Sequence, residues 1–224
     1  MTIRHISELV TIPAQPIGDD AQRERAYRVR DVERRRDDLL RAIGVPASFQ
    51  SYGLPTDAER GWDVEETVAM AAVMKYHAEG KWEPDAGQAL ILAGPTGVGK
   101  TLAACALINT LLVDLRAAQR FTLASALARR LTDYHQVDET MEIMTHTRLL
   151  VIDDLGDLEP RALGLIEEVL IVRQAEFRPV VITTNLTPQR LAEQFSDRIN
   201  DRLRAWGQVV RCTGASLRKG PKAT

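Results

Sequence analysis

Continuous apolar runs alternate with stretches of helical spacing from residue 65 onward. The runs at residues 89–93 (ALILA), 149–152 (LLVI) and 180–183 (VVIT) lack the alternation of a half-exposed strand, which indicates strands buried on both faces. Shorter strands are expected at residues 121–124 and 209–211. The segments expected to be helical are 65–79, 100–115, 125–131, 163–177, 188–195 and 198–204. Strands separated by helices predict an α/β fold, with a parallel sheet sandwiched by helices.

The N-terminal part of the chain has a different pattern. Residues 1–20 contain prolines and a glycine without periodicity, which predicts an irregular lead-in. Residues 21–43 have helical spacing and contain eight arginines and five acidic residues between Arg23 and Arg41. A thin apolar stripe runs along this segment through Val29, Val32, Leu39, Leu40 and Ile43. The pattern predicts a charged helix whose stripe packs either on the chain's own core or on another protein.

Glycines and prolines between residues 44 and 61 break the chain into a predicted linker. Phe49, Tyr52 and Trp62 are expected to attach this linker to the main domain. We therefore place a boundary near residue 60, between a helical N-terminal arm at residues 1–60 and a main domain at residues 61–224.

Composition restricts the class of protein. The 224 residues are 45% hydrophobic and 27% charged, as in an ordinary globular chain. No apolar leader or membrane-length run is present, and two distant cysteines give no zinc-ligand spacing. We expect a cytoplasmic protein with no membrane contact.

The net charge of −2 argues against a uniformly basic nucleic-acid binder. However, residues 198–224 contain seven basic residues and one acid, whereas the remainder contains 22 basic and 30 acidic residues. The C-terminal end is therefore a local cationic region.

The sequence GPTGVGKT at residues 94–101 has the form G-x-x-x-x-G-K-T, between a predicted strand and a predicted helix. Glycines let the backbone N–H groups curl around phosphate oxygens, and the helix N-terminus adds positive potential. We expect Lys100 to bridge the β and γ phosphates and the Thr101 hydroxyl to bind Mg²⁺. The predicted nucleotide contacts are Gly94, Pro95, Thr96, Gly97, Val98, Gly99, Lys100, Thr101 and Leu102.

Polar residues follow the next two long apolar runs. Asp153 and Asp154 come at the end of residues 149–152, and Asn185 follows residues 180–183. Ligands bind at the carboxyl ends of parallel strands, so Asp153 is expected to hold Mg²⁺ and Asp154 to act as general base. Asn185 or Thr184 would orient the water or contact the γ-phosphate. Each group could instead serve only as a turn cap or strand exit.

Arg198 and Arg202 are four residues apart and share one face of a predicted helix. A planar, permanently charged guanidinium can stabilise the γ-phosphate of a neighbouring subunit in the transition state. The alternative is surface ion pairing with Asp197 or Asp201.

With these motifs in this order, the chain resembles the helicase-loader branch of the AAA+ ATPases, the DnaC/IstB-like family. The likeness runs from about Leu39 to Arg218. Its motifs are GVPASF (44–49), GPTGVGKT (94–101), LLVIDDLG (149–156), RPVVITTNL (178–186), DRINDRL (197–203) and GASLR (214–218). The resemblance implies a P-loop NTPase domain of AAA+ type without a C-terminal lid.

The resemblance further implies ATP hydrolysis with Mg²⁺ by a homo-oligomer whose subunits associate head to tail. Asn185 would be the first sensor, Arg202 or, second, Arg198 the arginine finger, and Arg218 a second sensor. The implied partners are a replicative helicase, bound through residues 1–60, and single-stranded DNA. Arg129, Arg130, Lys219 and Lys222 are candidate DNA contacts, and the alternative for each is an ordinary solvated surface. The alternatives are an ATPase helper of a transposase, a P-loop small-molecule kinase and a purely structural nucleotide-binding module.

Overall fold

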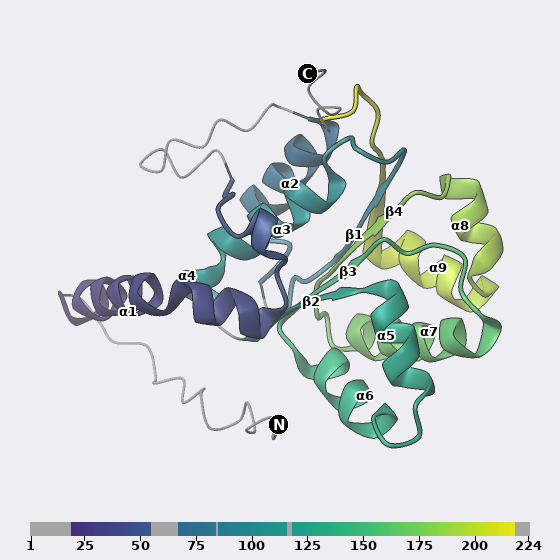
Figure 1. Cartoon of the computed structure of the whole chain (residues 1–224), viewed down its shortest axis with the longest axis horizontal. Coiled ribbons are helices and arrows are strands. Elements are labelled where there is room, and N and C mark those ends of the chain that lie inside the picture. Colours follow the sequence, from purple (N-terminus) through teal and green to yellow (C-terminus); the bar gives the residue numbers. More distant parts are fainter. Residues whose placement is uncertain (1–18, 55–66, 84, 116–117, 218–224) are drawn as a thin grey trace, which may run out of the picture.

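The computed structural model describes residues 19–54, 67–83, 85–115 and 118–217. Its centre is a five-stranded sheet in the order β2-β3-β4-β1-β5, in which every neighbouring pair is parallel (Figure 1). The strands are β1 (Ala89–Ala93), β2 (Gln119–Leu123), β3 (Leu149–Asp153), β4 (Val180–Thr184) and β5 (Gly207–Arg211). All residues of β1, β3 and β4 are buried. The predicted α/β class with a helix-covered parallel sheet is confirmed.

Helices cover both faces of the sheet, because alternate side chains of each buried strand point to opposite sides. Leu90 and Leu92 belong to one apolar core, and Ala89 and Ile91 to the other. The first core is covered by α2 (Val68–Ala78), α3 (Lys100–Thr110) and α4 (Leu112–Leu115). The second is covered by α5 (Ala124–Thr132), α6 (Val137–His146), α7 (Pro160–Ala175), α8 (Pro188–Gln194) and α9 (Asp197–Trp206). No helix follows β5 within the described residues.

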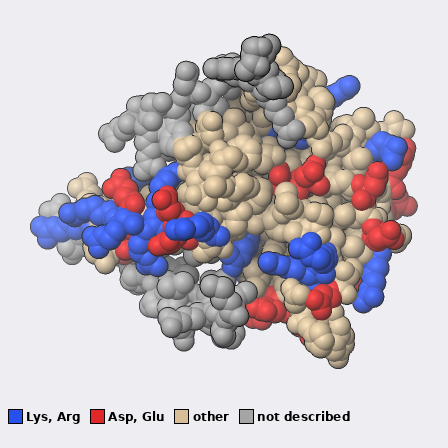
Figure 2. Space-filling model, in the orientation of Figure 1, with Lys and Arg blue, Asp and Glu red and all other residues tan. Residues whose placement is uncertain are grey.

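Helix α1 (Asp19–Ile43) extends to one side of the body in Figure 1, and charged side chains of both signs follow it in Figure 2. Its last turns join the body, since Leu40 and Ile43 are fully buried in the first core. Gly44 follows with φ +100°, and a Cβ there would lie 2.5 Å from the carbonyl oxygen of Phe121 in β2. The turn after α1 thus needs glycine for both its backbone angle and its close contact.

The predicted linker is anchored to α3. After the short 3-10 helix η2 (Ala47–Phe49), the Nδ2 of Asn109 donates to the carbonyl oxygens of Phe49 (3.1 Å) and Tyr52 (2.5 Å). The backbone N–H of Leu54 donates to Thr110 Oγ1 at 3.0 Å. Phe49 and Tyr52 therefore lie against the main domain, whereas Trp62 and the predicted boundary fall outside the described residues.

Three local features differ from the sequence expectations. Helix α6 was not predicted, the expected helix at 100–115 is interrupted at Leu111, and β2 begins at Gln119. Gln119 is fully buried and its Nε2 donates to the carbonyl oxygen of Ile108 at 3.3 Å. This hydrogen bond lets a polar side chain occupy a buried position at the start of the edge strand β2.

The second core contains a fully buried arginine, Arg173 of α7. Its Nη1 donates to the carbonyl oxygens of Met144 (2.7 Å) and Thr147 (2.9 Å), and its Nη2 to that of Pro179 (2.5 Å). The side chain ties α7 to the segments that lead into β3 and β4. Burial lowers its pKa to about 9.

Among the described residues, no helix combines the length and apolar character that a membrane span requires.

Candidate nucleotide-binding site

The phosphate-binding loop connects the carboxyl end of β1 to the first residue of α3. Gly97 and Gly99 have φ near +90° (+92° and +91°), which side chains rarely allow. A Cβ on Gly94 would lie 2.0 Å from the carbonyl oxygen of Cys212. The glycines at these positions are therefore required by the backbone, and they leave a cradle of main chain at the N-terminus of an eleven-residue helix. This cradle fits a phosphate group.

Lys100 lies inside this loop and is only 6% exposed. Its Nζ donates to the carbonyl oxygens of Gly94 (2.7 Å) and Pro95 (2.8 Å), and to Oδ1 of Asn185 at 3.0 Å. The ammonium group thus connects the loop after β1 with the end of β4. A cation held here can reach an anion in the cradle by exchanging carbonyl partners for phosphate oxygens.

Asp153 ends β3 beside the first turn of α3. Its Oδ1 accepts hydrogen bonds from Thr101 Oγ1 at 2.8 Å and from Thr183 Oγ1 at 2.6 Å. Burial raises the pKa of Asp153, and the two hydroxyl hydrogen bonds oppose that rise. A carboxylate and a threonine hydroxyl in contact form the oxygen donor set that suits Mg²⁺.

Asp154 adopts a left-handed backbone conformation, with φ +57°. Its backbone N–H donates to Thr183 Oγ1 at 2.9 Å, and its Oδ1 accepts from Asn185 Nδ2 at 2.7 Å. Because Asn185 also accepts from Lys100, one amide joins the cation of the loop to the carboxylate after β3. Non-glycine residues rarely adopt this left-handed backbone conformation, and those that do concentrate at functional sites.

These groups line a cavity of about 520 Å³. Five of the predicted site residues contribute to its wall, namely Lys100, Thr101, Asp153, Asp154 and Asn185. Of the other predicted loop contacts, Thr96, Gly97, Gly99 and Leu102 line the cavity as well. Val98 is almost fully buried, and Gly94 and Pro95 contact Lys100 through their carbonyl groups.

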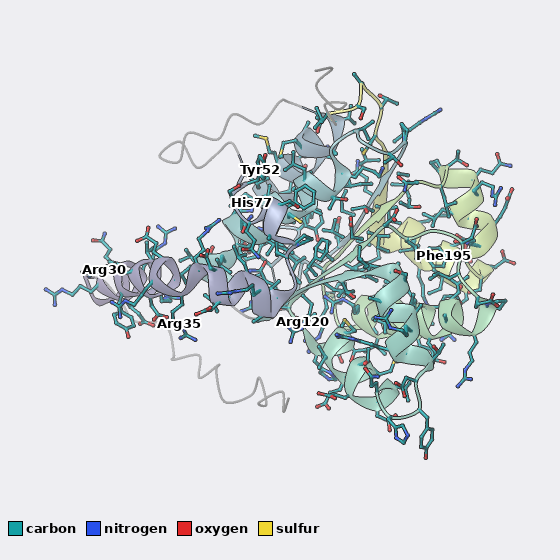
Figure 3. All side chains as sticks on the ribbon, viewed as in Figure 1. Arg30, Arg35, Tyr52, His77, Arg120 and Phe195 are labelled. Atoms are coloured by element: carbon teal, nitrogen blue, oxygen red, sulfur yellow. The ribbon has the colours of Figure 1, made fainter. Side chains whose placement is uncertain are left out.

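Six cavity residues were not predicted as site residues. Ser48, Phe49 and Tyr52 come from the segment after α1, and Figure 3 labels Tyr52. Leu123 ends β2, and Leu217 follows β5. Thr183 also lines the cavity and was read only as strand. Ser48 and Phe49 lie in the motif GVPASF, and Leu217 lies in GASLR. Neither motif indicated a place in the nucleotide site, because the tertiary fold brings these residues to the loop.

The two candidate finger arginines do not line the cavity of their own chain. Arg202 is half-buried, and its Nη1 donates to Oε1 of Gln174 at the end of α7. Arg198 lies one turn earlier on α9 and is exposed. Arg218, Lys219 and Lys222 lie outside the described residues.

A phosphate loop after the first strand, an acidic pair after the third and an asparagine after the fourth define a P-loop nucleotide-binding protein of the AAA+ type. Residues 70–224 match the family model described as IstB-like ATP binding protein. The chain belongs to this IstB/DnaC-like family of AAA+ proteins.

The similar proteins agree with this assignment. The y4pL protein of Sinorhizobium fredii, whose name describes an insertion sequence ATP-binding protein, is 31% identical over 188 residues, which cover 79% of this chain and 74% of that one. The crystal structure of DnaI is 24% identical, with a TM-score of 0.61, over 78% of this chain and 95% of that chain. The crystal structure of the DnaC helicase loader is 21% identical, with a TM-score of 0.60, over 75% of this chain and 100% of the DnaC chain. These two likenesses show the fold.

Proposed function

We propose that the protein is a Mg²⁺-dependent ATPase that acts on DNA together with a partner enzyme. The observation that carries the proposal is the convergence of Lys100, Thr101, Asp153, Asp154 and Asn185 on one cavity, joined by the hydrogen bonds described above. The loop N–H groups and Lys100 would bind the phosphates. Thr101 and Asp153 would hold Mg²⁺, which neutralises phosphate charge when bound.

Hydrolysis needs a group that orients the attacking water. Asp154 is the exposed carboxylate of the cavity wall, and the hydrogen bond from Asn185 fixes its direction. Asp154 would accept the proton of the water as general base, with Asn185 as the positioning residue that senses the γ-phosphate.

The test compares ATP binding with phosphate release. Lys100→Ala should abolish ATP binding, whereas Asp154→Asn, which retains an oxygen to accept from Asn185, should bind ATP but hydrolyse it about 10²- to 10⁴-fold more slowly. Lys75→Ala is the matched control, because Lys75 is an exposed lysine on α2. Transfer of phosphate to a small-molecule acceptor instead of water would favour a kinase, and ATP binding that survives Lys100→Ala would contradict the site.

An arginine of a neighbouring subunit would complete the site. The family motif favours Arg202 as this finger, but in the single chain its guanidinium donates a hydrogen bond to Gln174. Arg198 is the alternative, because its side chain is exposed and could reach a neighbouring subunit. In either case α9 of one subunit would face the cavity of the next, in a head-to-tail contact.

This proposal predicts complementation between subunits. Arg198→Ala and Arg202→Ala should each retain ATP binding, and the variant that removes the finger should lose hydrolysis. Mixing that variant with Lys100→Ala should restore part of the activity, because the mixed contact pairs an intact cavity with an intact arginine. If neither variant loses hydrolysis, or no mixture recovers it, the shared site is refuted.

The DNA contact would include the arginines at the end of α5. Arg129 and Arg130 are exposed in its last turn. Burial, followed by the charge of Arg130, lowers the pKa of Arg120 on the adjacent strand β2. Arg120 is labelled in Figure 3, where α1 meets β2. Arginines that repel one another favour the binding of an anion such as a DNA phosphate.

Replacing Arg129 and Arg130 with Gln together should weaken binding of single-stranded DNA and flatten its salt dependence by about one to two phosphate contacts. Arg161→Gln/Arg190→Gln, two exposed arginines on α7 and α8, is the charge-matched control. Equal losses in both pairs would indicate a general charge effect and contradict this surface.

For the partner, the 31% identity to an insertion sequence protein favours a transposase. Loading of a replicative helicase, which the sequence motifs suggested, is the second candidate, because DnaI and the DnaC helicase loader share the fold over nearly their full chains. In both cases the charged helix α1 would supply the partner contact.

Purified full-length protein with ATP should be tested against a transposase from an insertion sequence and against a replicative helicase. Capture of the transposase alone supports the first candidate, and capture of the helicase alone supports the second. The charge-reversal variant Arg30→Glu/Arg34→Glu should lose capture if α1 is the contact. Binding of neither enzyme would refute both candidates.

A further inference from the structure

The chain after β5 turns back over the phosphate loop, and we call residues 212–217 the clamp segment. The segment is joined to β1 at its start, where the N–H of Cys212 donates to the carbonyl oxygen of Ala93 at 2.7 Å. It is joined to the loop at its end, where the N–H of Leu217 donates to the carbonyl oxygen of Gly97 at 2.8 Å. The loop is therefore held between two hydrogen bonds from one segment.

Three loop glycines have the clamp segment directly against them. A Cβ on Gly94 would lie 2.0 Å from the carbonyl oxygen of Cys212, and one on Gly97 would lie 2.2 Å from Ser216 Oγ. A Cβ on Gly99 would lie 3.2 Å from Leu217 Cδ1. At these three glycines the clamp segment therefore packs directly against the loop.

The Leu217 hydrogen bond acts on the peptide unit between Gly97 and Val98. In a trans peptide the carbonyl and the next N–H point in opposite directions. Because the carbonyl of Gly97 points at the clamp segment, the N–H of Val98 points away from it. Phosphate loops bind anions through such N–H groups, so the orientation of this peptide bears directly on nucleotide affinity.

We propose that the clamp segment is a positioning element of the nucleotide site, in which Ser216 and Leu217 hold the phosphate loop in the conformation that binds ATP. The inference rests on the proposed nucleotide site. Within the described residues no helix follows β5, and Leu217 lines the cavity. Linkage makes the effect reciprocal: if the segment favours the ATP-binding loop, bound ATP must stabilise the segment.

The first test removes one hydrogen-bond donor. Leu217→Pro lacks the N–H that bonds to Gly97, whereas Leu217→Ala keeps it and loses only the side chain. Relative to Leu217→Ala, Leu217→Pro should bind ATP about three- to tenfold more weakly, as the loss of one backbone hydrogen bond implies. In steady-state hydrolysis the KM should rise while kcat stays within about twofold, because the clamp segment contacts the loop and not Asp154.

The second test uses the unmodified protein, so it does not depend on the folding of a variant. Amide hydrogen exchange in residues 213–217 should slow when saturating ATP is added, together with exchange in the loop. Residues 133–136, an exposed turn in the second core's helical layer, serve as the internal control and should not change.

The outcomes separate this inference from the proposed function. If the wild type does not bind ATP, the nucleotide site itself fails. If the wild type binds ATP but Leu217→Pro and Leu217→Ala bind equally, or exchange in residues 213–217 is unaltered by ATP, the clamp segment is only structural packing and the inference is overturned.

Discussion

At the scale of single residues, Thr183 determines the geometry of both acidic groups in the site. Its hydroxyl donates to Asp153 Oδ1 at 2.6 Å and accepts the N–H of Asp154 at 2.9 Å. One side chain on β4 therefore fixes the carboxylate proposed to hold Mg²⁺ and the backbone of the proposed general base. Residues that hydrogen-bond to metal ligands, without binding the metal themselves, often affect metal affinity strongly.

Thr183→Val should test this role, because valine preserves the shape of threonine and removes both hydrogen bonds. We expect Mg²⁺-dependent ATP binding to weaken about 10- to 100-fold, with a loss of about 1–3 kcal/mol in the free energy of unfolding. Titration of Mg²⁺ in a nucleotide-binding assay measures the first effect. Thr122→Val on the edge strand β2, where the hydroxyl bonds only to a neighbouring carbonyl, should change neither value; an equal response would contradict the proposed role.

The raised pKa of Asp153 gives a pH-dependent prediction. The folded state keeps the proton of this group to a higher pH than the unfolded chain does, chiefly because of burial. As pH rises from the ordinary aspartate pKa of about 3.9 through the raised value, the ionised folded state loses stability relative to the unfolded chain. That loss is complete above the raised pKa and persists at neutral pH.

Asp153→Asn carries no such penalty and can still accept from Thr101 and Thr183. Without Mg²⁺ and nucleotide, the variant should therefore melt at a higher temperature than the wild type at pH 7. The difference should shrink as the pH is lowered toward 4, as thermal melts across this range would show. A difference that is constant with pH would mean that ionisation of Asp153 is not its cause.

At the scale of elements, α1 consists of two different halves. Near its end, Leu39 and Leu40 are buried against the body, whereas Tyr27 in the first half is 65% exposed. The apolar stripe read from the sequence is thus used by the chain's own core at its C-terminal end. The first half remains available for the partner contact proposed above.

Leu40→Ala should separate the two halves energetically. Leu40 is fully buried, so its truncation should lower the free energy of unfolding by about 2–5 kcal/mol. Tyr27→Ala should change it by less than about 0.5 kcal/mol. Chemical denaturation followed by circular dichroism gives both values, and a large effect of Tyr27→Ala would show that the first half also packs on the body.

The sequence was sufficient for elements whose signal is local. Continuous apolar runs correctly predicted β1, β3 and β4, and the glycine pattern predicted the loop before α3. Where tertiary contacts decide, the prediction failed: Gln119 begins β2 because its amide finds the carbonyl of Ile108, and a break at Leu111 was invisible within an apolar run.

The same distinction holds for the site. Lys100, Thr101, Asp153, Asp154 and Asn185 stand at recognisable positions after strands, and the structure brings them together. Thr183 and Leu217 lie within the motifs RPVVITTNL and GASLR, but these motifs did not predict their roles. Those roles depend on which strand lies beside β3 and on the return of the chain over the loop.

At the scale of the whole molecule, the cavity lies between the segment that follows α1 and the α/β domain against which that segment packs. The segment after α1 forms one side of it, and the phosphate loop with the carboxyl ends of β2, β3 and β4 forms the other. A ligand that contacts both sides should stabilise the entire fold and not the loop alone.

We therefore expect ATP with Mg²⁺ to raise the melting temperature of the full-length protein. At a free ligand concentration of 100 times Kd, the stabilisation is about 2.7 kcal/mol, or roughly 5–10 °C for a domain of this size. Differential scanning fluorimetry with an ATP titration measures the shift. Lys100→Ala, which is expected to lose ATP binding, should show none, and a shift that survives in this variant would point to ATP bound elsewhere.

The docking of α1 against β2 and α4 has a consequence during protein synthesis. The helix leaves the ribosome before the strand and helix that cover Leu40 and Ile43 have been translated. At about 5–20 residues per second it waits for several seconds with its apolar end uncovered. The dense charges along α1 would keep this nascent segment soluble until β2 arrives, so the same arginines and acids can serve the chain before it has folded.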